Sequence, residues 1–195
     1  MRISRRAGLA GFGAALLGGP SVVRASGPTV TNVADTLAGD TRFSRFLDMV
    51  TRATMVTDLR QQGPITVFAP VNQAFQGAPA GFLNELLGMS GGQGPDQLEP
   101  QRQRLMALIN YHIVQGAFAQ GQLTNGQRLH TRNGKDLEVS GVMPNMAVRN
   151  PAPAQQTAGF GAAGAHVSAG PAQILGAPVM ASNGVIYPVS QLLWP

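Results

Sequence analysis

The first third of the chain places its apolar residues with the period of an α-helix. Four apolar side chains recur at i, i+3, i+4 and i+7, the spacing of one helical face, and they are Phe43, Phe46, Leu47 and Val50. Asp40 or Thr41 can cap the start of this helix by accepting a hydrogen bond from an early backbone N–H. The pattern predicts a helical region over residues 29–62, which ends at the turn signal Gly63-Pro64.

The next stretch changes from the pattern of a strand to that of a helical turn. Residues 65–69, ITVFA, carry the β-branched and aromatic side chains typical of a buried strand. Pro70 cannot donate a ladder hydrogen bond, so the strand is predicted to end there. Asn72 is expected to cap a short helical turn with its side-chain oxygen, which returns Ala74 and Phe75 to the core.

The middle of the chain contains its clearest helical pattern. A short helix is predicted over about 79–87, and a Gly-rich loop follows it. A longer helix is predicted after this loop, with Pro100 suited to its first turn. The apolar face of the longer helix comprises Leu105, Leu108, Ile109, His112 and Ile113.

The second half of the chain has the pattern of short strands joined by tight turns. Asn133-Gly134 and Asn183-Gly184 each lie between two extended runs, which is a strong signal for a hairpin. Residues 150–173 are poor in large apolar side chains and rich in Ala, Gly and Pro, so we expect a flexible excursion between strands. This segment is either a surface loop without a function, which we favour, or a lid over an apolar pocket.

The first 25 residues have the pattern of an export signal. A basic start is followed by a weakly apolar stretch at 7–17, and residues 23–25, VRA, fit the A-x-A-like cleavage pattern. The letters SRRAGL, at 4–9, resemble a twin-arginine signal, so we expect a periplasmic or secreted protein. The alternatives are a retained anchor and a disordered tail. The apolar stretch is shorter than the roughly 20 residues that a membrane span needs, and no stable span is expected after cleavage.

Removal of this signal changes the charge and therefore the partners that are expected. Of the fourteen Lys and Arg residues, four arginines lie in 1–25, which leaves ten against nine Asp and Glu. A charge near +1 provides no concentrated basic face for a nucleic acid. The chain has no cysteine, so neither disulfides nor thiolate chemistry is available. The residues that remain, 26–195, suit one domain.

Three separated stretches resemble the signature blocks of the fasciclin domain family. The letters TVFAPVNQAF (66–75) resemble its first block, LINYHIVQG (108–116) its central tyrosine-histidine block, and NGVIYPVSQLLWP (183–195) its second signature block. The resemblance covers nearly all of 29–195, except the apparent insertion at 150–173. The positions of the first and last blocks that we expect to build the fold are Thr66, Phe68, Pro70, Asn72, Phe75, Asn183 and Gly184.

The resemblance implies an α+β fold, in which a wedge of β strands has helices packed on one side. It implies adhesion or recognition without catalysis, with a protein or glycan of a cell surface or extracellular matrix as the partner. Some relatives bind carotenoids, so a carrier of an apolar small molecule in the periplasm is the alternative. In animal members the central block is associated with integrin binding, and the matching positions are Tyr111, His112, Ile109 and Ile113.

Two residues of the last block depart from the family. Tyr187 stands where the family usually has histidine, and Ser190 stands where it usually has aspartate. The resemblance therefore implies a reduced polar network at this end of the domain.

The Tyr111-His112 pair has two interpretations. It can contribute to a recognition surface, or it can pack in the core, because His112 lies on the apolar face of its helix. A buried imidazole needs a partner for its N–H, most simply a backbone carbonyl. We favour the structural role.

Other motifs lack the structural context that their chemistry needs. The letters GMSGG around Ser90 match the nucleophile elbow of hydrolases, which requires a strand before the serine and a helix after it. The letters GFGAAG at 159–164 match a dinucleotide fingerprint without the flanking strand and helix. An atypical hydrolase using Ser90 is therefore only a third hypothesis, and we expect no enzyme and no cofactor.

The residues that could hold a metal ion are dispersed along the chain. The three histidines, His112, His130 and His166, are far apart in sequence. Asp136 and Glu138 alternate on a predicted strand and face the same way, which a solvated strand face explains without calcium. We therefore predict no metal site.

Overall fold

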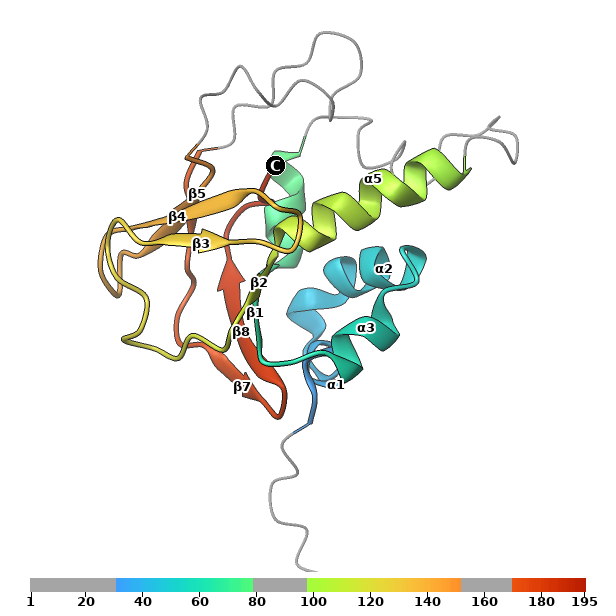
Figure 1. The fold of residues 1–195 in the computed structure, drawn as a ribbon, viewed down its shortest axis with the longest axis horizontal. Helices are drawn as coiled ribbons and strands as arrows, with labels where there is room; N and C mark the ends of the chain where they lie inside the picture. The colour runs from blue at the N-terminus through green and yellow to red at the C-terminus, as the bar shows by residue number, and fades with distance from the viewer. Residues whose placement is uncertain (1–30, 79–97, 152–169) are drawn as a thin grey trace, which may run out of the picture.

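The computed structural model of this protein describes residues 31–78, 98–151 and 170–195, with the side chains of 98–100 left out (Figure 1). The predicted signal at 1–25, the helix expected near 79–87, Ser90 and the GFGAAG motif lie outside these ranges, and so does His166. Within the same ranges, no helix is long and apolar enough to cross a membrane.

The N-terminal region is helical, as predicted, but it consists of several short helices. They are α1 (Val33–Gly39), the 3-10 helix η1 (Thr41–Phe43), α2 (Ser44–Arg52) and α3 (Val56–Gln61). The predicted cap is Asp40, whose carboxylate accepts a hydrogen bond from the backbone N–H of Arg42 at the start of η1. Helix α2 buries Phe46 and Val50, as its pattern predicts. Thr54, which follows it, has a φ of 59° and separates α2 from α3.

Sheet A brings the three signature blocks side by side. Its strand order is β2-β1-β8-β7, with bounds β1 (Ile65–Pro70), β2 (Ile113–Gln115), β7 (Val179–Ala181) and β8 (Gly184–Val189). Strand β1 comes from the first block, β2 from the tyrosine-histidine block and β8 from the last one. Strands β1 and β8 pair in parallel from Ile65↔Gly184 to Pro70↔Val189, so β1 ends at the predicted proline.

Sheet B is a smaller antiparallel sheet. Its strands, in the order β3-β4-β5-β6, are β3 (Arg128–His130), β4 (Asp136–Ser140), β5 (Ala147–Arg149) and β6 (Ala172–Gln173). The predicted hairpin joins β3 to β4, and Gly134 in its turn has a φ of 82°, which glycine adopts without steric cost. An isolated bridge between Val114 and Thr131 connects sheet B to sheet A. Strand β6 lies inside 150–173, so the C-terminal end predicted for that excursion is wrong: residues 172–173 pair with β5.

Strands β1 and β8 separate two apolar cores. Successive side chains of a strand point to opposite faces. Ile65, Val67 and Ile186 therefore pack with the helices, whereas Phe68 and Tyr187 pack with sheet B. Figure 1 shows α1, α2 and α3 on one side of β1 and β8, with β3, β4 and β5 on the other. The fold is α+β, as predicted, with a core on both faces of the central strands.

The helix of the central block is shorter than its pattern predicts. Helix α5 (Leu98–Tyr111) ends at Tyr111, and Ile113 begins strand β2. The prediction that Ile113 shares the helical face is therefore wrong. The apolar run serves two elements in succession, because the backbone carbonyl of His112 accepts a hydrogen bond from Phe68 N–H of β1, at 2.9 Å, and the chain continues as a strand.

Candidate functional site

His112 lies at the junction of α5 and β2 and is fully buried. Its Nδ1 is 2.8 Å from the carbonyl oxygen of Leu108, and its Nε2 is 3.0 Å from the backbone nitrogen of Leu193. The Leu193 N–H can only donate, so Nε2 accepts, and the proton of the neutral ring is on Nδ1 and is donated to Leu108. Burial lowers the pKa of His112 to about 4, although its hydrogen bond to the Leu108 carbonyl acts in the opposite direction. The neutral imidazole therefore connects the central block to the last block through hydrogen bonds to Leu108 and Leu193.

Tyr111 has a similar structural role on the other face. Its side chain is buried in the core next to sheet B, and its hydroxyl donates to the carbonyl oxygen of Asp136 at 3.1 Å. Burial, together with the Asp136 carboxylate, raises the pKa of Tyr111 above its ordinary value. Ile109 and Ile113 are buried as well. The four residues predicted as a binding site therefore lie in the interior, and recognition through them stays a prediction that would require an indirect, supporting role.

Asn72 caps a different helix from the predicted one. The short helix that contains it, η2 (Asn72–Gly77), has no side-chain cap. Instead, Asn72 Oδ1 accepts a hydrogen bond from the backbone N–H of Arg45 in α2, at 3.1 Å, and its Nδ2 donates to the carbonyl oxygen of Thr41 at 2.9 Å. The sequence prediction was wrong about the partner, because the start of α2 lies beside this corner only in the folded chain. Phe75 is buried beyond it, as expected.

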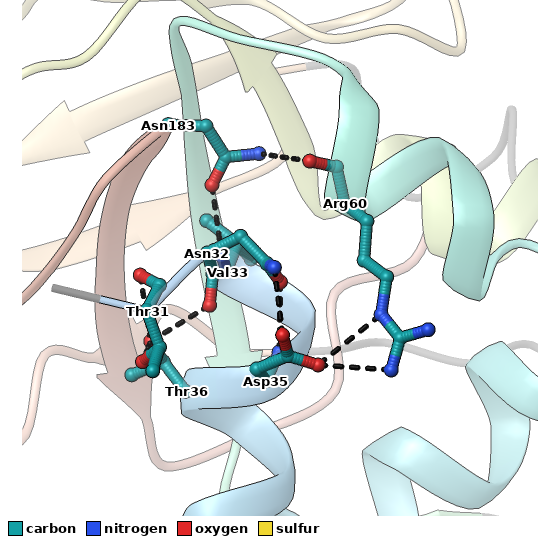
Figure 2. A network of polar contacts seen from close by, with 7 residues as sticks. All are labelled: Thr31, Asn32, Val33, Asp35, Thr36, Arg60 and Asn183. Carbon is teal, nitrogen blue, oxygen red and sulfur yellow. Dashed lines mark hydrogen bonds and ion pairs between the residues drawn. The ribbon is translucent and has the colours of Figure 1, made fainter. Parts of the chain in front are cut away.

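Asn183 joins three segments that are far apart in the sequence (Figure 2). Its Oδ1 accepts from the backbone N–H of Val33 at 2.8 Å, and its Nδ2 donates to the carbonyl oxygens of Leu59 and Gln62 at 2.8 and 2.6 Å. The sequence predicted only a turn residue here. An asparagine satisfies these groups because its amide combines an acceptor with two donors.

An ion pair lies beside the Asn183 amide. Figure 2 shows Asn32 and Asp35 at the start of α1, with the Asp35 carboxylate reaching Arg60 of α3 at 2.9 Å. The side chain of Asn32 in turn accepts from the backbone N–H of Asp35 at 2.9 Å. The network fastens α1 and α3 to each other near the β7–β8 turn.

Gly184 and Thr66 complete the junction of the first and last blocks. A Cβ on Gly184 would overlap the carbonyl oxygen of Ile65, so the close pairing of β1 and β8 requires glycine. The hydroxyl of Thr66 donates to the carbonyl oxygen of Gly116 at 2.7 Å and accepts from Phe118 N–H at 2.9 Å. These contacts hold the loop that follows β2 against β1.

The two residues that depart from the family have partners of their own. The Tyr187 hydroxyl donates to the carbonyl oxygen of Phe118 at 3.0 Å, and its ring stacks on Phe68 with centroids 5.7 Å apart. Burial raises the pKa of Tyr187. The hydroxyl of Ser190 accepts from Gln173 N–H of β6 at 2.9 Å. The polar contacts at this end are therefore made by neutral hydroxyl groups.

The carboxylates of β4 face the same way, as predicted, and each has a partner across sheet B. Asp136 lies 3.0 Å from His130 Nδ1, and Glu138 lies 2.8 Å from Arg149 Nη2. Among the described residues, no group of three or more His, Asp or Glu side chains could hold a metal ion. The carboxylates are thus part of the surface of the sheet.

Among the clefts of the described surface are the following two. One, of about 410 Å³, lies between η1 and the Val71–Gln73 corner, and Leu175 contributes to its wall. The other, of about 490 Å³, lies where the α3–β1 connection, the end of β2 and Arg132 meet. The sequence analysis missed this second cleft, because its walls come from residues 61–65, 115–116 and 132, and no local pattern connects these segments.

Comparison with known proteins agrees with this arrangement of the three blocks. The model of the fasciclin domain matches residues 41–195. The chain belongs to the fasciclin domain family.

Relatives of this fasciclin domain occur in animals and bacteria. It is 30% identical over 168 residues to the transforming growth factor-beta-induced protein ig-h3 of Oryctolagus cuniculus, covering 86% of this chain and 20% of that protein. It is 28% identical over 174 residues to protein sll1483 of Synechocystis sp., covering 89% and 79%. It is 25% identical over 140 residues to the cell surface glycolipoprotein MPB83 of Mycobacterium bovis, covering 72% and 48%. The chain thus spans a fifth of the ig-h3 protein but most of sll1483.

A solved structure has the same fold. The FAS1 domain pair of the insect cell adhesion molecule fasciclin I superposes with a TM-score of 0.52 and 15% sequence identity, covering 78% of this chain and 45% of the pair. This likeness concerns the fold alone. The related proteins place the domain in a family with a cell-surface member.

Proposed function

We propose that this fasciclin domain is a non-catalytic binding module, which mediates adhesion or recognition at the cell envelope or outside the cell. The observation that carries the proposal is its similarity, over 72% of its length, to a cell surface glycolipoprotein. The signal pattern of residues 1–25 supports export to the periplasm or beyond. The partner is a protein or a glycan of a cell surface or an extracellular matrix.

The chemistry of the signature blocks supports binding rather than turnover. General acid–base catalysis needs a titrating group within reach of a substrate. His112 is fully buried, and both of its ring nitrogens are engaged with backbone groups. The buried hydroxyls of Tyr111 and Tyr187 also donate to backbone carbonyls. These polar groups bond backbone atoms inside the fold. We therefore propose that recognition uses the surface of the domain.

The alternative carrier role stays a prediction from the family resemblance. The apolar side chains on both faces of β1 and β8 form close-packed cores. The cleft near Arg132 is lined by the amides of three glutamines and a guanidinium, together with Pro64, Ile65 and two glycines, and its polar side chains suit a polar ligand. The described contacts therefore favour binding at the surface over an apolar cargo.

A binding assay with the exported protein tests the proposal. The protein is purified from its own organism, its mass is measured, and its binding to intact cells and to isolated extracellular matrix is titrated. Saturable binding, displaced by unlabelled protein and lost after heat unfolding, is the expected result. Absence of saturable binding would contradict the proposal. An esterase activity that is lost in Ser90→Ala would also contradict it, because it would support the hydrolase hypothesis. A pigment or lipid that copurifies in stoichiometric amount would favour the carrier.

A further inference from the structure

The cleft near Arg132 has the dimensions and position of a binding site. It lies where sheet A meets sheet B, and its volume of about 490 Å³ is within the range of small-ligand pockets. Its walls belong to three segments that are held together by the fold. On one side is the connection from α3 to β1, and on the other are Gln115, at the end of β2, and Arg132 in the β3–β4 hairpin.

Arg132 extends from a well-anchored backbone. Its N–H donates to the carbonyl oxygen of Ile113 at 2.8 Å, and the residue before it, Thr131, bridges to Val114. The hydroxyl of Thr131 donates to the carbonyl oxygen of Lys135 at 2.6 Å, which closes the hairpin. Tertiary contacts therefore hold the backbone from which the Arg132 guanidinium extends.

The guanidinium of Arg132 has a buried nitrogen without an acceptor in the described part of the chain. Its Nη1 is inaccessible to solvent and makes no hydrogen bond to a described residue. Several other arginines among the described residues have carboxylate partners, among them Arg42, Arg60 and Arg149. A buried N–H of a charged group is unfavourable unless it is bonded. Arg132 also lines the cleft, so its guanidinium is available to an anionic acceptor that enters there.

The other lining side chains indicate what surrounds that anion. The exposed amides of Gln61, Gln62 and Gln115 line the same cleft, together with the apolar residues Pro64 and Ile65. A primary amide both donates and accepts hydrogen bonds, which matches a hydroxyl group. A guanidinium binds a carboxylate through two parallel N–H···O bonds, and its single positive charge matches a single negative one. This combination suits a carboxylate that is surrounded by hydroxyl groups.

A peptide fits this place less well than a sugar. Peptides commonly bind at a free strand edge, where they add a strand. At the outer edge of β2, the carbonyl of Ile113 already accepts from Arg132, and Val114 already bridges to Thr131. Recognition here must therefore use side chains, and the side chains present suit hydroxyl groups.

From these contacts we infer that the cleft formed by Arg132 and the three glutamines binds a uronic acid unit of an acidic polysaccharide. Arg132 pairs with the carboxylate, and the amides bond the neighbouring ring hydroxyls. This inference deepens the proposed function, on which it rests, by naming the chemical class of its ligand.

Isothermal titration of the full-length protein with tetragalacturonic acid tests the site. Arg132→Gln should weaken binding about tenfold or more, because it removes a charge-assisted pair of hydrogen bonds. Arg132→Lys should bind less tightly than the wild type, because an ammonium lacks the fork. Arg128→Gln is the matched control: it removes an exposed cation from the same hairpin and should change the affinity less than about twofold.

A second variant and two further ligands keep the test independent of folding. Gln115→Ala alters an exposed side chain and should weaken binding about threefold, whereas the methyl ester of the tetramer should not bind. Equal binding of the ester, or undiminished binding by Arg132→Gln, would overturn the inference. A tetraglutamate peptide that binds as tightly as the tetramer would overturn the assignment to a sugar. If Arg132→Gln still adheres to cells as the wild type does, this site fails while the proposed adhesion stands.

Discussion

Acidification should reveal how strongly the core depends on a neutral His112. The imidazole is fully buried, with the Nδ1 proton donated to Leu108 and Nε2 accepting from Leu193. Protonation would place a second proton on Nε2, facing the Leu193 N–H, and would leave a charge in an apolar core. Burial therefore lowers the pKa of His112 to about 4, from its ordinary value of 6.5.

The sign and size of the effect follow from this difference in pKa. In the unfolded chain the imidazole binds a proton below about pH 6.5, whereas the folded protein resists protonation until about pH 4. The contribution of His112 to stability is thus fully present above pH 6.5 and is lost as the pH falls toward 4. This difference of about 2.5 between the two pKa values corresponds to a loss of about 3 kcal/mol in the free energy of unfolding once the pH is below both of them. About 2 kcal/mol of this is lost between pH 7 and pH 5.

The measurement is the free energy of unfolding by urea, from pH 7.5 down to pH 4.5, for the wild type and His112→Gln. Glutamine retains a donor and an acceptor but does not titrate. We expect the variant to be about 1–3 kcal/mol less stable at pH 7, because two buried hydrogen bonds are disturbed. The difference should shrink by about 2 kcal/mol by pH 5.

The control for this experiment is His130→Gln. Its ring is exposed and lies beside Asp136 on sheet B, so the substitution should change the unfolding free energy at pH 7 by less than about 1 kcal/mol. Parallel curves for the wild type and His112→Gln across the whole pH range would refute the argument, since they would mean that His112 titrates alike in the folded and unfolded chains.

Three further substitutions test the joints between the blocks. Asn183→Ala should lower the free energy of unfolding by about 2–4 kcal/mol in urea melts, because it leaves one backbone N–H and two carbonyl groups without their partner; a loss below 0.5 kcal/mol would contradict this. Gly184→Ala should cost more than about 2 kcal/mol or prevent folding, whereas Gly39→Ala, where a Cβ meets no atom within 4 Å, should be nearly neutral in the same thermal melts. Asn72→Ala should cost about 1 kcal/mol and reduce the protection of early α2 amides in hydrogen exchange, and unchanged protection would argue against the cap.

The three blocks that resemble the family signatures build the interior of the fold and not a binding surface. Each block supplies one of three neighbouring strands, β2, β1 and β8, and each also supplies a polar side chain that bonds backbone groups of another segment. The side chains that do so are those of Asn72, His112 and Asn183. In a chain without cysteine, such contacts and the two apolar cores hold the segments together.

Local patterns in the sequence were sufficient for most elements. Strand β1, its end at Pro70, helix α2 and the turns at Asn133-Gly134 and Asn183-Gly184 follow from side-chain periodicity and from the backbone preferences of proline and glycine. The burial of His112 also followed from the apolar pattern of the residues around it, although the helix itself ends at Tyr111. These features depend on neighbours within a few positions along the chain.

The sequence alone thus determined the main elements, because periodicity and turn chemistry act over short distances, and the resemblance of its three blocks to the fasciclin family implied the α+β class. Only the tertiary structure decided that Asn72 caps α2, that Asn183 joins its own turn to α1 and α3, and that Arg132 lines one cleft with glutamines of α3 and β2. The physical reason is that a side-chain hydrogen bond or a cleft wall depends on which segments the cores bring together. The sequence around a polar residue looks the same whether its hydrogen-bond partner is 3 or 150 positions away, as for Asn183 and Val33.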